Sequence, residues 1–116
     1  AMVQVSQPRQ PCWKLAKRWG VKKLPLHVQE TGRTGWYFRV LEEGEVCSGT
    51  DIECIERTNT DWPISHANEV MHLNQTDWSA AAEVADCPGL SNNWRATLLH
   101  RVEKQTVEDS SKRLQG

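Results

Sequence analysis

The sequence lacks any long apolar run and any skew of charge. No stretch of its 116 residues approaches the ~20 apolar residues that a membrane-spanning helix needs. No signal-peptide pattern opens the chain, so we expect a cytoplasmic protein with no membrane partner. The 14 lysines and arginines balance 15 aspartates and glutamates, which argues against a polycation that binds nucleic acid.

Cysteine motifs and aromatic rings other than indole are also scarce. The four cysteines form no C-x-x-C pair and no Cys/His set at zinc-finger spacing, and a cytoplasmic location disfavours a disulfide framework. We therefore expect reduced thiols at Cys12, Cys47, Cys54 and Cys87. One Phe and one Tyr stand against six Trp, so indole is expected to supply much of the aromatic packing.

The first half of the chain reads as short strands and short helices. Apolar side chains alternate with polar ones in the segments predicted as strands. Helix formers that end at a glycine predict helices at Cys12–Trp19 and Leu24–Glu30. The predicted strands are Val3–Ser6, Trp36–Leu41 and Asp51–Arg57, with a short extended piece at Glu45–Cys47.

The second half reads as three helices after a polar connector that ends at Pro63. Ser65–His72 has helical periodicity, Asp77 can cap a helix that runs through Ala85, and Ser91 can cap a longer one through about Lys104. The tail from residue 106 to 116 is polar. We therefore predict an α+β chain divided at residue 60, with strands in residues 1–60 and a three-helix part in residues 61–116.

Three strands, one of them short, cannot close a barrel or cover a sheet on both of its faces. The chain must then borrow strands from a partner or form part of a larger fold. Because the first strand already begins at residue 3, we expect a domain that is entered midway.

The sharpest chemical candidate is Cys12 in the stretch QVSQPRQPCWKL. Pro8 and Pro11 stiffen this loop because each fixes φ and removes a backbone donor. Arg9 and a helix N-terminus would both favour the thiolate, which attacks electrophiles and binds soft metals. A small buried thiol with no function is the competing interpretation. Catalysis by a Cys–His pair has no supporting motif.

The remaining polar candidates carry weaker signals. His66 and His72 are six residues apart and share no helix face as metal ligands would, so both are expected to be ordinary, with His27 and His100 solvated. The stretch TGRTG around Arg33 is compatible with an anion-binding turn or a plain turn. Arg39 is either solvated or directed toward the Cys12 loop. The lysine-rich first helix is expected to be a solvated face.

These motifs taken together resemble a known family. The succession QVSQPRQPCWKL and TGRTGWYFRVLEEGEV is similar to the C-terminal half of a MOSC domain, the β-barrel domain named after the C-terminal region of molybdenum cofactor sulfurase. The segments ISHANEVMH, LSNNWRATLLHRV and VEDSSKRLQG resemble the three-helix extension of the YiiM-type bacterial members. The resemblance implies a partial MOSC-type β-barrel followed by a small three-helix extension.

The resemblance also implies a function. Cys12 would be the thiolate ligand of molybdenum, with Arg9 and Arg39 as partners of an anionic pterin phosphate or of the substrate. Gln7, Thr34 and Gly35 would line the cofactor cleft together with Arg9. The implied activity is molybdenum-cofactor-dependent reduction of N-hydroxylated bases, linked to hydroxylaminopurine resistance, with electrons from a separate reductase.

The family members also carry a preceding half, which holds the first barrel strands and which this chain lacks. Much of the cofactor pocket is expected in that half. The alternative function is therefore a non-catalytic MOSC fragment that associates with copies of itself through open strand edges.

Overall fold

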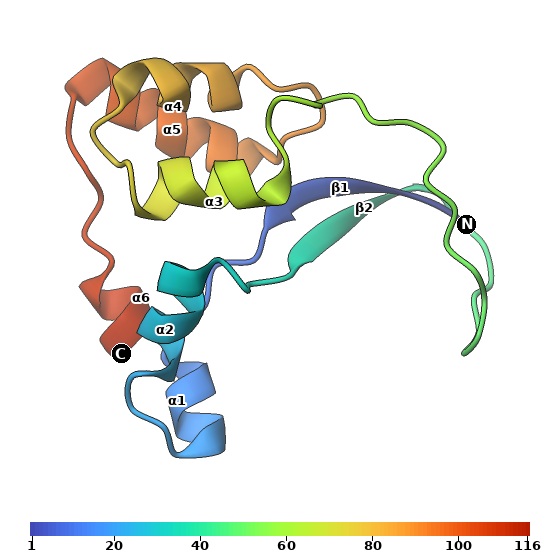
Figure 1. Ribbon diagram of the computed structural model, residues 1–116, viewed down its shortest axis with the longest axis horizontal. Helices are drawn as coiled ribbons and strands as arrows, with labels where there is room; N and C mark the ends of the chain where they lie inside the picture. The colour runs from blue at the N-terminus through green and yellow to red at the C-terminus, as the bar shows by residue number, and fades with distance from the viewer.

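The computed structural model describes residues 1–116 and has three parts (Figure 1). A two-stranded sheet extends to one side and ends at the N-terminus. Three helices, α3 (Ile64–His72), α4 (Trp78–Ala85) and α5 (Asn92–Lys104), pack together beside the base of the sheet. Three further helices gather below that base: α1 (Lys14–Trp19), α2 (Leu24–Thr31) and α6 (Ser111–Gln115). No helix is both long enough and apolar enough to cross a membrane.

The sheet consists of β1 (Met2–Pro8) paired antiparallel with β2 (Trp36–Glu42). Both strands were predicted, and each is slightly longer than its sequence pattern indicated. The register places Val5 opposite Phe38 and Pro8 opposite Trp36, so the sheet ends where the Pro8–Cys12 loop begins. Apolar side chains of β2 are exposed along its whole length.

The strand predicted at Asp51–Arg57 is absent, and this prediction was wrong. Residues 43–57 form no helix or strand, and Ile52 is 87% exposed. A strand needs a neighbour that completes its backbone hydrogen bonds. The sheet offers only two open edges, and this segment pairs with neither of them. An apolar pattern alone therefore did not make a strand here.

The three-helix part follows its capping residues closely. The Asp77 carboxylate accepts a hydrogen bond from the Ala80 N–H at 3.0 Å, and the Ser91 hydroxyl accepts one from the Trp94 N–H at 3.2 Å. Each satisfies a backbone donor at a helix start that has no partner within the helix. The predicted caps are confirmed, and they set where α4 and α5 begin.

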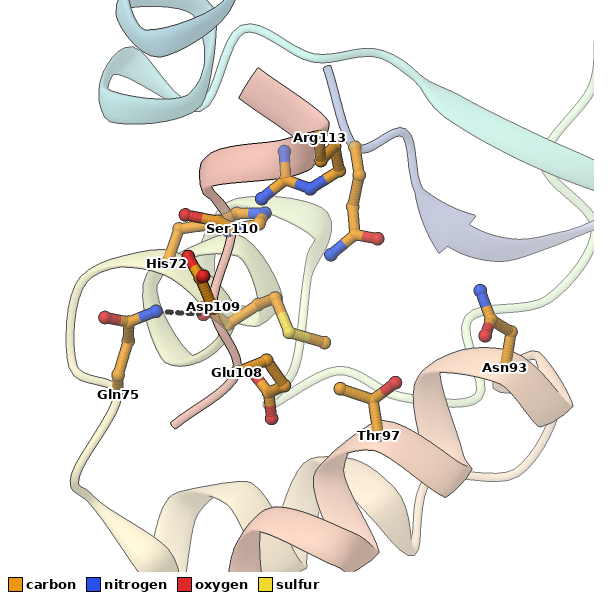
Figure 2. A pocket seen from close by; sticks show the side chains of 10 residues that line it. His72, Gln75, Asn93, Thr97, Glu108, Asp109, Ser110 and Arg113 are labelled. Atoms are coloured by element: carbon orange, nitrogen blue, oxygen red, sulfur yellow. Dashed lines mark hydrogen bonds between the residues drawn. The ribbon is translucent and has the colours of Figure 1, made fainter. Parts of the chain in front are cut away.

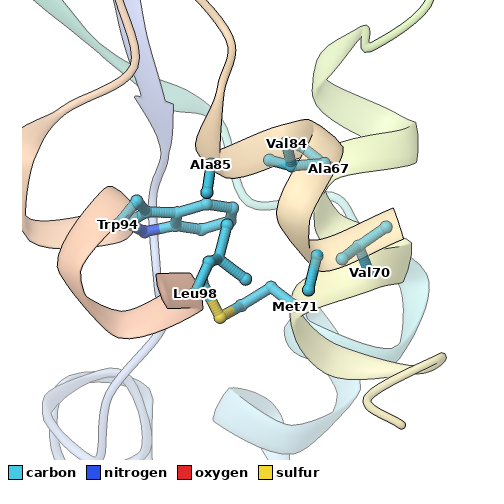
Figure 3. Packing of buried hydrophobic residues seen from close by; sticks show 8 residues of the cluster. Ala67, Val70, Met71, Val84, Ala85, Trp94 and Leu98 are labelled. Carbon is cyan, nitrogen blue, oxygen red and sulfur yellow. The ribbon is translucent and has the colours of Figure 1, made fainter. Parts of the chain in front are cut away.

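The core lies between α3, α4 and α5 (Figure 3). Trp94 and Leu98 from α5 face Val84 and Ala85 from α4 and Met71 from α3. Trp94 is the one tryptophan that is fully buried. The small alanines of α4 allow close approach to this large ring, which accounts for the alanine-rich sequence of α4. None of the eight residues of this core comes from the sheet.

One buried cation ties the C-terminal segment to this core. Arg101 of α5 has no exposed surface, and its guanidinium donates hydrogen bonds to the Val70 and Met71 carbonyls at 2.9 and 3.1 Å. It also contacts both carboxylate oxygens of Glu108, at 3.1 and 2.6 Å. The pair anchors the chain directly before α6, a helix that the polar tail did not predict.

Candidate functional site

The candidate site is built around the loop that presents Cys12. Pro8 and Pro11 are both fully buried, whereas the Cys12 side chain between Pro11 and α1 is partly exposed. The Arg9 N–H donates to the Gly35 carbonyl at 2.9 Å, which joins this loop to the chain entering β2. Gly35 has φ +71°, a left-handed conformation that glycine adopts without strain. The loop is therefore rigid and holds its thiol within reach of solvent.

A contact from the far end of the chain also holds this loop. Arg113 of α6 donates a hydrogen bond to the Pro11 carbonyl at 2.6 Å and another to the Gln29 side chain at 2.8 Å. The Trp13 N–H donates to the Arg113 carbonyl at 2.8 Å. Sequence reasoning missed this residue, because a tail arginine separated by about a hundred positions from the motif carries no local signal.

Three of the predicted cleft residues lie at the base of the sheet. Gln7 accepts a hydrogen bond from the Ser91 hydroxyl at 2.6 Å, which links β1 to the start of α5. Thr34 is buried, and the Asn68 side-chain amide donates to its hydroxyl at 3.1 Å. Gly35 follows directly and meets the Arg9 N–H. The structure thus brings Gln7, Arg9, Thr34 and Gly35 to one end of the sheet. Each of the four takes part in a structural hydrogen bond there, Arg9 through its main-chain N–H.

The arginines predicted as anion partners, Arg9 and Arg39, lie in different environments. Arg9 is half-buried at the base of the sheet, and neither ion pair of the chain involves it. The sequence left Arg39 either solvated or directed toward the Cys12 loop, and the structure places it in an exposed position. Its guanidinium donates to the Gln4 side chain at 2.9 Å and to the Gly89 carbonyl at 3.1 Å, so it ties β2 to the turn before α5. Arg33 is exposed in the connection to β2.

A polar cavity of about 170 Å³ lies next to the loop, between α3, α5 and the C-terminal segment (Figure 2). Asn93 and Thr97 of α5 face it from one side, and Ser110 and Arg113 from the other. Gln10 from the Cys12 loop also lines it, but Cys12 does not. The cavity therefore lies beside the Cys12 loop, and the thiol is not part of its lining.

His72 at the wall of this cavity is buried and has an unpaired Nε2. Its pKa is lowered to about 4, first by burial and then by the positive charges of Arg113 and Arg101, with Glu108 opposing. The ring is thus neutral near neutral pH and packs edge-on against Trp94. His72 was expected to be an ordinary polar or partly buried histidine, whereas the structure places it in a buried position. His27, His66 and His100 are exposed.

Comparison with known proteins places the chain in a family. A MOSC domain model matches residues 1–53, and a YiiM-like, 3-alpha helix domain model matches residues 62–105. The chain belongs to the MOSC proteins of the YiiM type, and its fold is the mixed helix-and-strand fold that they share. The resemblance read from the motifs is confirmed.

Several relatives set the scale of the similarity. The chain is 43% identical over 104 residues to the uncharacterized protein YflK of Bacillus subtilis, covering 90% of this chain and 47% of the relative. It is 31% identical to Protein YiiM of Escherichia coli over 116 residues, covering 100% of this chain and 51% of the relative. The crystal structure of that YiiM superposes with a TM-score of 0.94 over 98% of this chain and 56% of the other.

A fungal protein is similar over a shorter region. A protein of Gibberella moniliformis named "Reductase" is 32% identical over 87 residues, covering 75% of this chain and 16% of the relative. The chain spans about half the length of the bacterial relatives it matches.

Proposed function

We propose that this chain contributes the metal-binding thiol of a molybdenum-cofactor protein that reduces N-hydroxylated bases. The observation that carries the proposal is the partly exposed Cys12 on a loop fixed by two buried prolines. Membership in the MOSC family and similarity to a protein named "Reductase" support it. A separate reductase would supply the electrons, and a small N-hydroxylated purine or related base would be the substrate.

The donor set of the chain fits this cofactor. No three His, Cys, Asp or Glu side chains come together as a group that could hold a metal ion alone. The pterin brings sulfur ligands of its own, so the protein needs to add one soft thiolate on a rigid support. Cys12 meets that need, since its loop is held by the sheet on one side and by α6 on the other.

The neighbouring residues suggest how an anionic group would be held. Arg9 is half-buried, follows the buried Pro8, and forms no ion pair within the chain. Its guanidinium is therefore available to a phosphate or to a polar substrate near Cys12. Arg39 is less available, because it already donates to Gln4 and Gly89. We assign Arg9 the larger part of any anion binding.

When bound, the cofactor supplies the two-electron oxygen transfer that turns an N–OH group and two protons into an N–H group and water. The chain's own part is to hold one ligand still and to keep a cation beside the site. Rigid placement matters because reorganising the loop at each turnover would add to the barrier.

The test is the molybdenum content of the chain after expression in a host that makes the cofactor. The variants are Cys12→Ala and, as a matched control, Cys54→Ala, whose thiol is exposed but lies in the segment without helix or strand. We expect metal in the parent chain and the control and none in Cys12→Ala. Equal metal in all three would contradict the proposal, and so would its absence from a folded parent chain.

A second candidate function is association with another copy of the chain through the sheet. The observation that favours it is the exposure of apolar side chains on β1 and β2, among them Val5, Phe38 and Val40, beside two open strand edges. Sedimentation of the chain and of Val40→Lys tests it: a dimer that the substitution dissociates supports this function. A monomeric parent chain contradicts it.

A further inference from the structure

The C-terminal helix α6 makes specific contacts with the loop that carries the proposed metal ligand. Its Arg113 side chain contacts the Pro11 carbonyl, and its main-chain carbonyl receives the Trp13 N–H. These two contacts bracket Cys12 on both sides. We propose that Arg113 is a positioning residue, which holds the Pro11–Trp13 segment and thereby the Cys12 thiol in a fixed place; this inference rests on the proposed function of Cys12.

The contacts of Arg113 with the Pro11–Trp13 segment, here called the clamp, are joined by a contact of the same side chain with α2. The other terminal nitrogen of Arg113 donates to the side-chain oxygen of Gln29, which is itself buried. A planar guanidinium can serve two acceptors at fixed angles, which one ammonium on a flexible stem does less well. Arg113 therefore joins three segments, the loop, α2 and α6, through one rigid group.

The helix that carries Arg113 is itself held in place by further contacts. Glu108 is held by the buried Arg101, and the Asp109 carboxylate accepts a hydrogen bond from the Ser111 N–H at 2.9 Å, where α6 begins. A β-carbon placed on Gly116 would lie 3.6 Å from the Trp13 ring, so the end of α6 packs against that indole. Helix α6 is therefore held on one side through the segment that Arg101 anchors to the core, and on the other side by its contact with the loop.

The charge of Arg113 is not matched by a carboxylate. Both hydrogen-bond acceptors are neutral, and neither ion pair of the chain includes Arg113. Burial lowers the pKa of this guanidinium, and nearby Cys12 acts in the opposite direction. Both terminal nitrogens of the guanidinium are used on the loop and on α2, as a positioning role requires.

Amide hydrogen exchange of the full chain tests the clamp without any metal. The Trp13 N–H reports the loop, and the N–H of the fully buried Leu98 in α5 reports global opening. In the parent chain we expect the Trp13 amide to be protected. In Arg113→Gln the exchange of the Trp13 amide should speed up by about 10-fold, the worth of the lost hydrogen bond to the Pro11 carbonyl of the loop, while that of Leu98 changes by less than about 2-fold.

Two further variants complete the design. Lys112→Gln removes a neighbouring exposed cation of the same helix and should change neither amide. Arg113→Lys should recover part of the Trp13 protection and covers the case in which Arg113→Gln does not fold. A merely structural role would move Trp13 and Leu98 together, and that result would overturn the proposal. Unprotected Trp13 in the parent chain would also overturn it.

The molybdenum content of Arg113→Gln separates this inference from the function on which it rests. If Cys12→Ala removes the metal and Arg113→Gln lowers its content by several-fold with Leu98 exchange unchanged, both stand. If Cys12→Ala retains the metal, the proposed function fails, whatever the exchange data show. If Arg113→Gln loosens Trp13 but keeps the full metal content, the positioning role fails and the metal site stands.

Discussion

Replacing Arg101 by methionine tests whether the buried guanidinium is what joins the C-terminal segment to the core. Methionine keeps much of the length and apolar volume of the side chain, so packing is largely preserved. The change leaves the buried Val70 carbonyl without a donor and the Met71 carbonyl with only the Gln75 side-chain amide, at 3.3 Å. It also leaves Glu108 without its partner, although that carboxylate is 37% exposed and can turn toward water.

The expected loss is about 2–4 kcal/mol of unfolding free energy, since the Val70 acceptor left unpaired costs about 1–3 kcal/mol and the hydrogen bond lost at Met71 about 1 kcal/mol. That is a large part of the roughly 6–17 kcal/mol that a chain of this size has in total. Urea unfolding followed by circular dichroism measures it.

The matched control for this experiment is Glu108→Gln, which changes the exposed partner and leaves Arg101 and its two carbonyl contacts in place. We expect this control to cost about 1–2 kcal/mol, less than Arg101→Met, because the glutamine side-chain oxygen can still accept from the buried guanidinium and only the charge of the 37% exposed partner is lost. The prediction depends on this asymmetry. Equal losses in the two variants, or a loss below about 1 kcal/mol in Arg101→Met, would refute the account of the anchor.

Two further predictions concern acid stability and helix capping. The pKa of His72 falls from 6.5 to about 4 in the folded chain, so the unfolded chain binds more protons between these values. Unfolding free energy should therefore decrease as pH falls from 6.5 to about 4, by up to about 3 kcal/mol, and His72→Gln should flatten that part of the urea-derived profile. Asp77→Ala removes only a helix cap and should cost about 1 kcal/mol, whereas Ser91→Ala also removes the hydrogen bond to Gln7 and should cost about 2–3 kcal/mol by the same assay. An unchanged profile in His72→Gln, or equal costs for the two caps, would contradict these assignments.

Local sequence signals were sufficient for most of the helices and for the two paired strands. Gly20 and Gly32 end α1 and α2 in left-handed conformations, and Asp77 and Ser91 begin α4 and α5. These signals act over a single turn, so the residues nearby contain all the information. The motif around Cys12 was recognisable for the same reason, because its prolines and thiol are adjacent in the chain.

The segment Asp51–Arg57 shows a structural feature that local sequence signals cannot predict, the pairing of a strand. Its residues are suitable for a strand, but a strand exists only when another backbone completes its hydrogen bonds, and no local pattern says whether that partner is present. The exposed side chains of β1 and β2 raise the same question for the predicted partial barrel, because two strands cannot close a barrel and local patterns do not say which strands would complete it.

The sequence by itself determined most of the helices, the two paired strands, the family and the thiol at the centre of the candidate site. Tertiary structure alone decided what holds that thiol. Arg113 reaches Pro11, Arg101 reaches Val70, and Gln7 meets Ser91, and each pair is far apart in the chain. Such contacts form only after the helices have packed, because the geometry that aligns a donor with its acceptor is a property of the folded chain and not of either residue's neighbours.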